Sequence, residues 1–132
     1  MKGFYGNIEE QTLENEDFRR VLYTSEYSQL VLMSIAPDSE IGLETHKNDQ
    51  FFRFEQGRGS VLIDGHRYSV GDGDAIVVPA GAEHNVVNIS DTQALKFYTI
   101  YSPPHHKDGV VNATKADAES NDPAFDGQTT EH

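Results

Sequence analysis

The chain has 132 residues, which is enough for one domain and too few for two. It contains no cysteine, so disulfide bonds and thiolate metal sites are excluded. The formal net charge of −12 at pH 7 should repel phosphate backbones and anionic lipid surfaces, so we expect no nucleic acid and no membrane as partners. Ordinary solubility is the simpler explanation of this acidity, and adaptation to high salt is the alternative.

Residues 1–18 are polar and acidic with scattered aromatic side chains, which predicts an arm or at best a short helix. The first seven residues lack the apolar core and the small-residue cleavage site of a secretory signal. Apolar runs elsewhere are too short to span a membrane. These observations make the cytoplasm the expected location.

Residues 19–102 carry a regular pattern of short β-rich runs separated by turn residues, as in all-β sandwiches and barrels. Asp64-Gly65, for example, is a two-residue hairpin signal because both positions favour positive φ. The expected strands cover residues 19–25, 29–36, 41–46, 50–56, 59–64, 67–70, 75–79, 84–89 and 94–102.

Residues 103–132 differ from this pattern and are expected to extend the barrel rather than to form a second domain. Pro103-Pro104 ends the last strand, and residues 105–109 are typical of a loop. Residues 113–120 fit two helical turns, and residues 121–132, ending in His132, are polar and expected to be mobile. The chain is therefore interpreted as one domain over 1–132, with its barrel core at about 19–102.

Polar side chains point toward the interior of this predicted barrel. Alternation along 50–55 puts Gln50 on the same face as Phe52 and Phe54. An unpaired buried amide costs roughly 1–3 kcal/mol, so a partner is needed. Glu44 and His46 lie two residues apart and project the same way from a strand, as an ion pair or as two ligands of one metal ion. His84 opens a later strand, and all four groups converge if these strands are neighbours.

The stretch from Gly73 to Asn88 resembles the second sequence motif of the cupin family. It matches at the five fixed positions Gly73, Pro79, Gly81, His84 and Asn88. The first cupin motif, counted back from Gly57, is degenerate. Glu44 and Gln50 stand where a histidine and a glutamate are usual, Asp38 stands in the leading glycine position, and His46 keeps the usual histidine. The resemblance covers about residues 29–102 and implies an all-β cupin double-stranded β-helix, or jelly-roll barrel.

The resemblance also implies a metal site formed by Glu44, His46, Gln50 and His84. Two imidazoles, one carboxylate and one amide oxygen suit a divalent transition metal ion, with Fe, Mn, Ni, Co, Zn and Cu all compatible. Further segments resemble a group of small stand-alone bacterial cupins often labelled mannose-6-phosphate isomerase-related. These segments are 49–52, 79–85, 98–106 and 113–118.

Such a site predicts a small-molecule enzyme of the isomerase, lyase or dioxygenase type, acting on a polar sugar-like or carbonyl metabolite. Phe52, Phe54 and Tyr101 are the candidates for its substrate pocket. A non-catalytic ligand-binding or metal-binding module and a metal-free structural barrel are the alternatives. A homodimer formed by strand exchange through residues 1–25 is also expected, because open sheets leave edges to be covered.

Each site residue also has a purely structural interpretation. His46 and His84 would then be hydrogen-bonded core histidines, Glu44 a surface residue and Gln50 a hydrogen-bonding partner of a neighbouring group. His105 and His106 follow two prolines, which favours a solvated loop over a place in the site. His66, beside the hairpin at Asp64-Gly65, is expected to be exposed.

Overall fold

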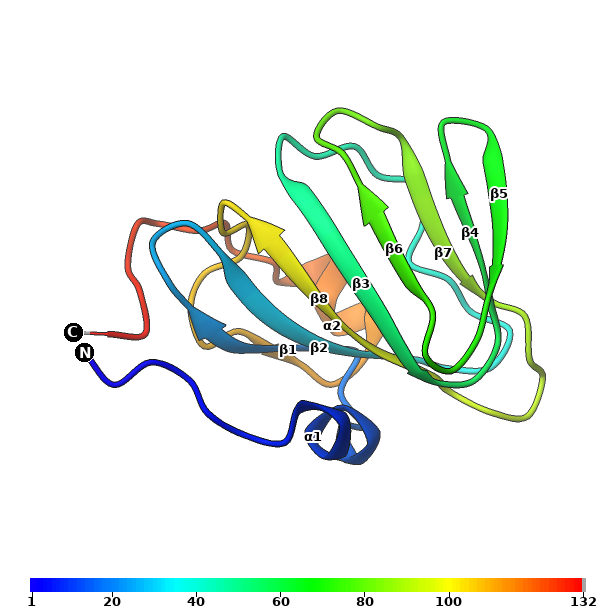
Figure 1. Cartoon of the computed structure of the whole chain (residues 1–132), viewed down its shortest axis with the longest axis horizontal. Coiled ribbons are helices and arrows are strands. Elements are labelled where there is room, and N and C mark those ends of the chain that lie inside the picture. The colour runs from blue at the N-terminus through cyan, green and yellow to red at the C-terminus, as the bar shows by residue number, and fades with distance from the viewer. Residues whose placement is uncertain (132) are drawn as a thin grey trace.

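The computed structural model describes residues 1–131 of the chain. Within this range β-strands dominate and two short helices lie outside the sheets (Figure 1). The strands are β1 (Arg19–Thr24), β2 (Gln29–Ile35), β3 (Asp49–Gln56), β4 (Gly59–Ile63), β5 (His66–Val70), β6 (Ala75–Val78), β7 (His84–Asn88), β8 (Leu95–Ser102) and β9 (Val111–Asn112). The helices are α1 (Ile8–Glu14) and α2 (Lys115–Ser120).

The strands form two antiparallel sheets, which confirms the all-β expectation. The larger sheet has the order β6-β3-β8-β2-β1-β9 and the smaller one the order β5-β4-β7. The chain crosses repeatedly between the two sheets, as in a jelly roll. In Figure 1 the strands of the smaller sheet lie at the right beside β6, and α2 lies behind the larger sheet.

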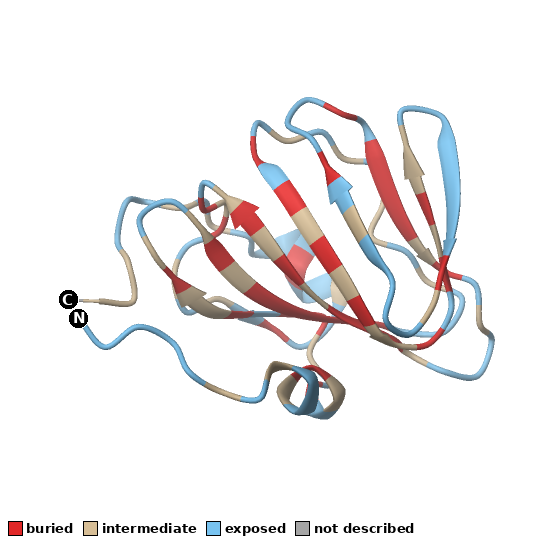
Figure 2. Ribbon diagram, viewed as in Figure 1, coloured by how far each residue is buried: buried red, intermediate tan, exposed pale blue. Residues whose placement is uncertain are grey.

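The core lies on the inner face of the larger sheet and has a polar layer at one end. Along β3, buried side chains alternate with more exposed ones (Figure 2). Strand register sets Gln29, Tyr101 and Gln50 side by side on β2, β8 and β3. The next buried layer is Val31, Thr99 and Phe52, and the third is Met33, Phe97 and Phe54. The barrel is thus apolar in depth and polar at the level of Gln50.

The strand expected over residues 41–46 does not form as a regular element. The segment makes isolated bridges at Glu40 and Glu44 and runs antiparallel along β7. Gly42 has φ +110, and its N–H donates to the Asn85 side chain at 2.8 Å instead of to a neighbouring strand. A residue in this conformation interrupts the pleat. The prediction of regular strand geometry was therefore wrong, although the adjacency to β7 on which the site depends is present.

The short helices expected within residues 1–18 and 113–120 both form, and only the tail after them is more ordered than expected. Asn7 caps α1 by accepting from the Glu10 N–H, and Thr114 caps α2 by accepting from the Asp117 N–H. The tail after α2 returns to the sheets through an N–H···O bond from Thr130 to Thr24 at 2.9 Å. The expectation of a mobile tail is wrong for 121–131, and His132 lies outside the described residues.

The first residues of the chain lie beside the last described ones (Figure 1). The Glu131 carboxylate accepts from the backbone N–H groups of Lys2 and Gly3 at 2.9 and 2.7 Å. Among residues 1–131, no helix has the length and apolar character required to cross a membrane.

Candidate metal centre

Two backbone segments bring Glu44 and His84 together. The Glu44 N–H donates to the His84 carbonyl and the His84 N–H donates to the Glu44 carbonyl, each at 2.9 Å. The Gly81 N–H donates to the His46 carbonyl at 2.8 Å, which fixes the next part of the segment against the turn before β7. The position of Glu44 and His46 beside β7 is therefore set by the main chain.

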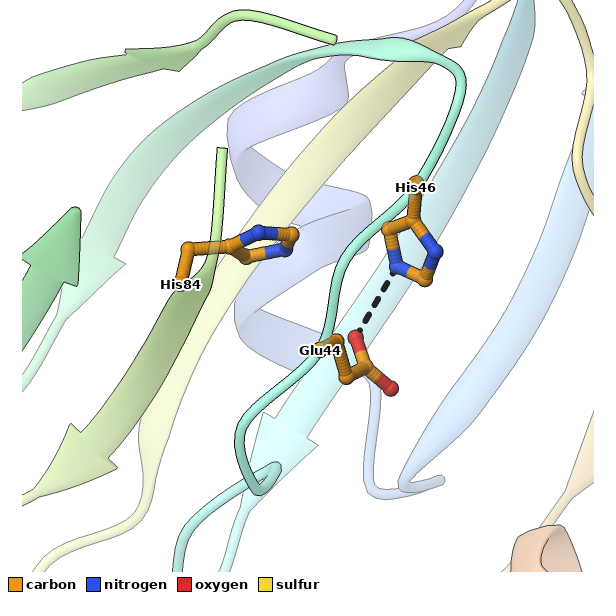
Figure 3. Close-up of side chains that lie close together, drawn as sticks. All are labelled: Glu44, His46 and His84. Carbon is orange, nitrogen blue, oxygen red and sulfur yellow. Dashed lines mark hydrogen bonds and ion pairs between the residues drawn. The ribbon is translucent and has the colours of Figure 1, made fainter. Parts of the chain in front are cut away.

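Glu44, His46 and His84 form a cluster whose candidate ligand atoms all lie within 4.8 Å of one another. Figure 3 shows the three side chains converging, with a 3.0 Å contact between His46 Nε2 and Glu44 Oε2. The two imidazole centroids are 5.2 Å apart. The predicted convergence of these three residues is confirmed.

His84 is prepared to act as a ligand. Its Nδ1 lies 3.0 Å from the Ala82 carbonyl oxygen, an acceptor, so Nδ1 carries the proton. Nε2 then has a free lone pair, yet it is buried and has no hydrogen-bond partner among the described residues. Metal-bound histidines usually donate their second ring N–H to a carbonyl or carboxylate in this way. The unpaired Nε2 is the observation that best fits a bound ion.

Gln50 has the same kind of unpaired atom. Its Nε2 donates to Thr99 Oγ1 at 3.0 Å, whereas its Oε1 is buried without a partner in the described chain. The side chain is 2% exposed, as alternation along the strand predicted. An orphaned amide oxygen at this level of the barrel is compatible with a fourth metal donor, and that role stays a prediction.

The cluster favours an ionised carboxylate. Burial alone would raise the pKa of Glu44, but the hydrogen bond and positive charge of His46, with Arg19 and His84, bring that pKa below its ordinary value. A carboxylate and two imidazoles are hard to keep together without a shared proton or cation. The donor set of two nitrogens and one anionic oxygen fits a divalent transition metal ion.

His105 and His106 are not solvated loop residues, contrary to the sequence-based expectation. His106 is 2% exposed, and its ring contacts Asp122 Oδ1 at 2.9 Å and the Tyr101 hydroxyl at 3.3 Å. The His105 ring centroid lies 4.3 Å from that of His46. Burial, helped by the nearby His106 and His46, lowers the pKa of His105 to about 4.

Sequence reasoning could not find these two because the signal is long-range. The side-chain Oε1 of the buried Gln29 accepts from both the His105 and His106 backbone N–H groups, which turns the loop inward. Gln29 lies far from them in the chain, and the sequence around it indicates only an ordinary strand residue. A buried amide on an otherwise apolar strand was the one hint available.

The three residues expected to line a substrate pocket have different environments. The Tyr101 ring lies 6.0 Å from His46, and burial raises the pKa of its hydroxyl above the ordinary value. The Phe52 ring lies 6.5 Å from His84 and closes the inner side of the cluster. Phe54 instead packs 5.1 Å from Phe97 within the apolar core and is fully buried.

Comparison with known proteins identifies the family. The model of the cupin domain family matches residues 31–101, which is more than half of the chain and spans all three clustered residues. The chain belongs to the cupin family. The second-motif match from Gly73 to Asn88 is thereby explained, and the cluster occupies the position that the cupin resemblance implied.

Relatives of this cupin are known by sequence and by structure. It is 48% identical over 124 residues to the uncharacterised protein YrkC of Bacillus subtilis, covering 89% of this chain and 66% of YrkC. It is 42% identical over 113 residues to the uncharacterised protein L612 of Acanthamoeba polyphaga mimivirus, covering 83% and 71% of the two chains. The crystal structure of BH2720 from Bacillus halodurans superimposes with a TM-score of 0.88 at 43% identity, covering 91% and 96%. These names carry no assigned activity.

Proposed function

We propose that this cupin binds one divalent transition metal ion through Glu44, His46, His84 and Gln50 and is a small-molecule enzyme. The unpaired Nε2 of His84 carries the proposal, because it is buried beside a carboxylate and a second imidazole with its own tautomer fixed. Fe, Mn, Ni, Co, Zn and Cu all suit this mixed donor set.

A bound ion would supply Lewis acidity toward a substrate oxygen. The chain itself contributes the rest of the environment. Phe52 and the layers beneath it exclude water from the inner side, and Tyr101 and His105 border the cluster on the other side. Isomerase, lyase and dioxygenase chemistry on a polar sugar-like or carbonyl metabolite are the reactions that this environment favours. The grouping with mannose-6-phosphate isomerase-related cupins remains a prediction.

Metal content tests the first half of the proposal. Untagged protein should contain about one transition metal ion per chain by elemental analysis, and His84→Ala should lower the metal affinity by about 100-fold or more because a ligand is lost. His66→Ala is the matched control, since His66 is exposed on β5. Circular dichroism verifies that both variants fold. If wild-type protein binds none of the candidate ions after reconstitution, the proposed metal site is refuted.

Turnover tests the second half. Metal-replete protein should convert at least one member of a panel of sugars, keto acids and enediols, followed by nuclear magnetic resonance of the mixture. Thermal stabilisation by a panel compound without conversion would point instead to a non-catalytic binding module, because ligand binding alone raises apparent stability. The His84→Ala protein should be inert toward the same compound.

A further inference from the structure

A cavity of about 230 Å³ opens beside the metal cluster, between β1, the 39–46 segment and α2. Glu44 forms part of its wall, so the cavity adjoins the metal site. Arg19 lies on another part of the wall, and Lys115, Glu119 and Asp122 line the side formed by α2 and the residue pair after it. The C-terminal extension therefore helps to shape the approach to the site.

Arg19 is a buried cation with incomplete compensation. Its side chain is 6% exposed, and its Nε and Nη1 have no hydrogen-bond partner in the described chain. The nearest carboxylate oxygen, Oδ1 of Asp122, is 3.6 Å from Nη1 and already forms the 2.9 Å hydrogen bond to His106. Buried charges of this kind are normally paired and fully hydrogen-bonded.

The net charge around the cavity would change sign when a metal ion binds. Two side-chain cations, Arg19 and Lys115, face three carboxylates, those of Glu44, Glu119 and Asp122. This leaves a net negative charge, which a divalent ion at Glu44 would reverse to a single net positive charge. A monoanion would then balance the cavity, whereas a dianionic phosphate group would overcompensate it.

We propose that the substrate is a short monocarboxylate whose carboxyl group pairs with Arg19 and whose second oxygen, a hydroxyl or a keto group, faces the metal cluster. This inference rests on the proposed metal-dependent function and narrows its substrate class. Guanidinium groups bind carboxylates by charge-assisted hydrogen bonds, and Arg19 lies on the cavity wall. The cavity is smaller than the roughly 300–1,000 Å³ of pockets for drug-sized ligands, which favours a molecule of few carbons.

The test compares acids with their neutral amides by isothermal titration calorimetry of the full chain. Glycolate, lactate and pyruvate are the probes, and lactamide and inorganic phosphate are the comparison ligands. At least one acid should bind metal-loaded wild-type protein about tenfold or more tighter than lactamide and phosphate, as expected for hydrogen bonds to a charged group. Equal affinity for acid and amide, or no binding of any of the three acids, would overturn the inference.

Arg19→Gln should weaken binding of that acid by about tenfold or more and leave lactamide binding unchanged. Arg20→Gln is the matched control, because Arg20 projects outward with a side chain 49% exposed and pairs with Asp17. Unchanged acid binding in folded Arg19→Gln would refute the role of Arg19. Should Arg19→Gln fail to fold, the acid–amide comparison on wild-type protein decides, with Arg19→Lys as the second variant.

Metal content is measured for each protein in the same experiment. A wild-type chain that binds no metal but still binds the acid through Arg19 would separate the two proposals: the metal function would fail and the anion site would stand. If the metal-loaded protein binds none of the three acids, only the proposed substrate class is refuted.

Discussion

The hydrogen bonds of the two ring nitrogens distinguish a structural histidine from one that can bind a metal ion. His106 uses both ring nitrogens, toward Asp122 and Tyr101, and so has no free lone pair. His84 uses only Nδ1. Although the two imidazoles are equally buried, His84 alone of the two is available as a ligand. The same reasoning separates Gln29, whose oxygen accepts two N–H groups, from Gln50, whose oxygen accepts none in the described chain.

Glu131 at the junction of the chain ends should make stability depend on pH. Hydrogen bonds from the Tyr23 hydroxyl and from the Lys2 and Gly3 N–H groups lower the pKa of Glu131 from 4.5 to about 2. Because the folded pKa is depressed, this stabilisation is complete above the unfolded value and is lost as pH falls from about 5 toward 2.

Urea unfolding of wild-type and Glu131→Gln proteins between pH 7 and pH 2.5 measures this contribution. The variant should be less stable at pH 7, and the difference from wild type should shrink as the pH falls. Glu26→Gln, in the exposed turn after β1, is the control and should track the wild type. A difference that stays constant across this pH range would contradict the assignment.

At the scale of elements, one side chain of the second cupin motif has a purely structural task. Asn88, at the end of β7, is 1% exposed and donates through Nδ2 to the carbonyls of Ile35, Ala36 and Gln93. Its Oδ1 accepts from the Ser90 N–H at 2.9 Å. The residue thus ties the end of β2 to the turn between β7 and β8.

Asn88→Ala should lower the free energy of unfolding by about 3 kcal/mol, because it leaves several buried carbonyls without a donor. Asn85→Ala removes one bond, to the Gly42 N–H, and should cost about 1 kcal/mol. Urea denaturation of both variants checks the ranking. Equal losses would show that hydrogen bonding by Asn88 does not control this corner of the fold.

Local patterns predicted the elements well and failed where distant contacts decide the geometry. Alternation placed Gln50 and Phe52 on the inner face of β3, and motif spacing brought Glu44, His46 and His84 together. The 41–46 segment lost its pleat because Gly42 bonds to a side chain on another strand. His105 and His106 turned inward because of Gln29. The sequence around these residues does not indicate either contact.

At the scale of the whole molecule, the segment before α1 carries exposed apolar side chains, although its backbone is bonded to Glu131. Met1 and Tyr5 are almost fully exposed, and Tyr27, in the turn between β1 and β2, is 76% exposed. β1 already pairs with β2 and β9 of its own chain. A strand exchange through residues 1–25 would re-form these same pairings between two copies, and it stays a prediction.

We expect the protein to be a homodimer with twice the 14.7 kDa chain mass by light scattering coupled to size-exclusion chromatography. The double variant Tyr5→Ser/Tyr27→Ser should shift it toward the monomer, because the apolar area that drives association is lost. Val77→Ser, 63% exposed on β6, is the control and should remain dimeric. A monomeric wild type at tens of micromolar, about the range in which stable dimers persist, would refute this expectation.

The donors at the centre come from opposite layers of the barrel. Glu44, His46 and His84 belong to the smaller sheet and the segment running beside it, whereas Gln50 belongs to β3 of the larger sheet. An ion bound by all four residues would cross-link the two sheets. Metal binding should therefore restrict local opening of the segment beside β7. Amide protons of residues 39–46 should exchange with solvent far more slowly in the metal-loaded protein than in the metal-free protein, even though no strand has been added.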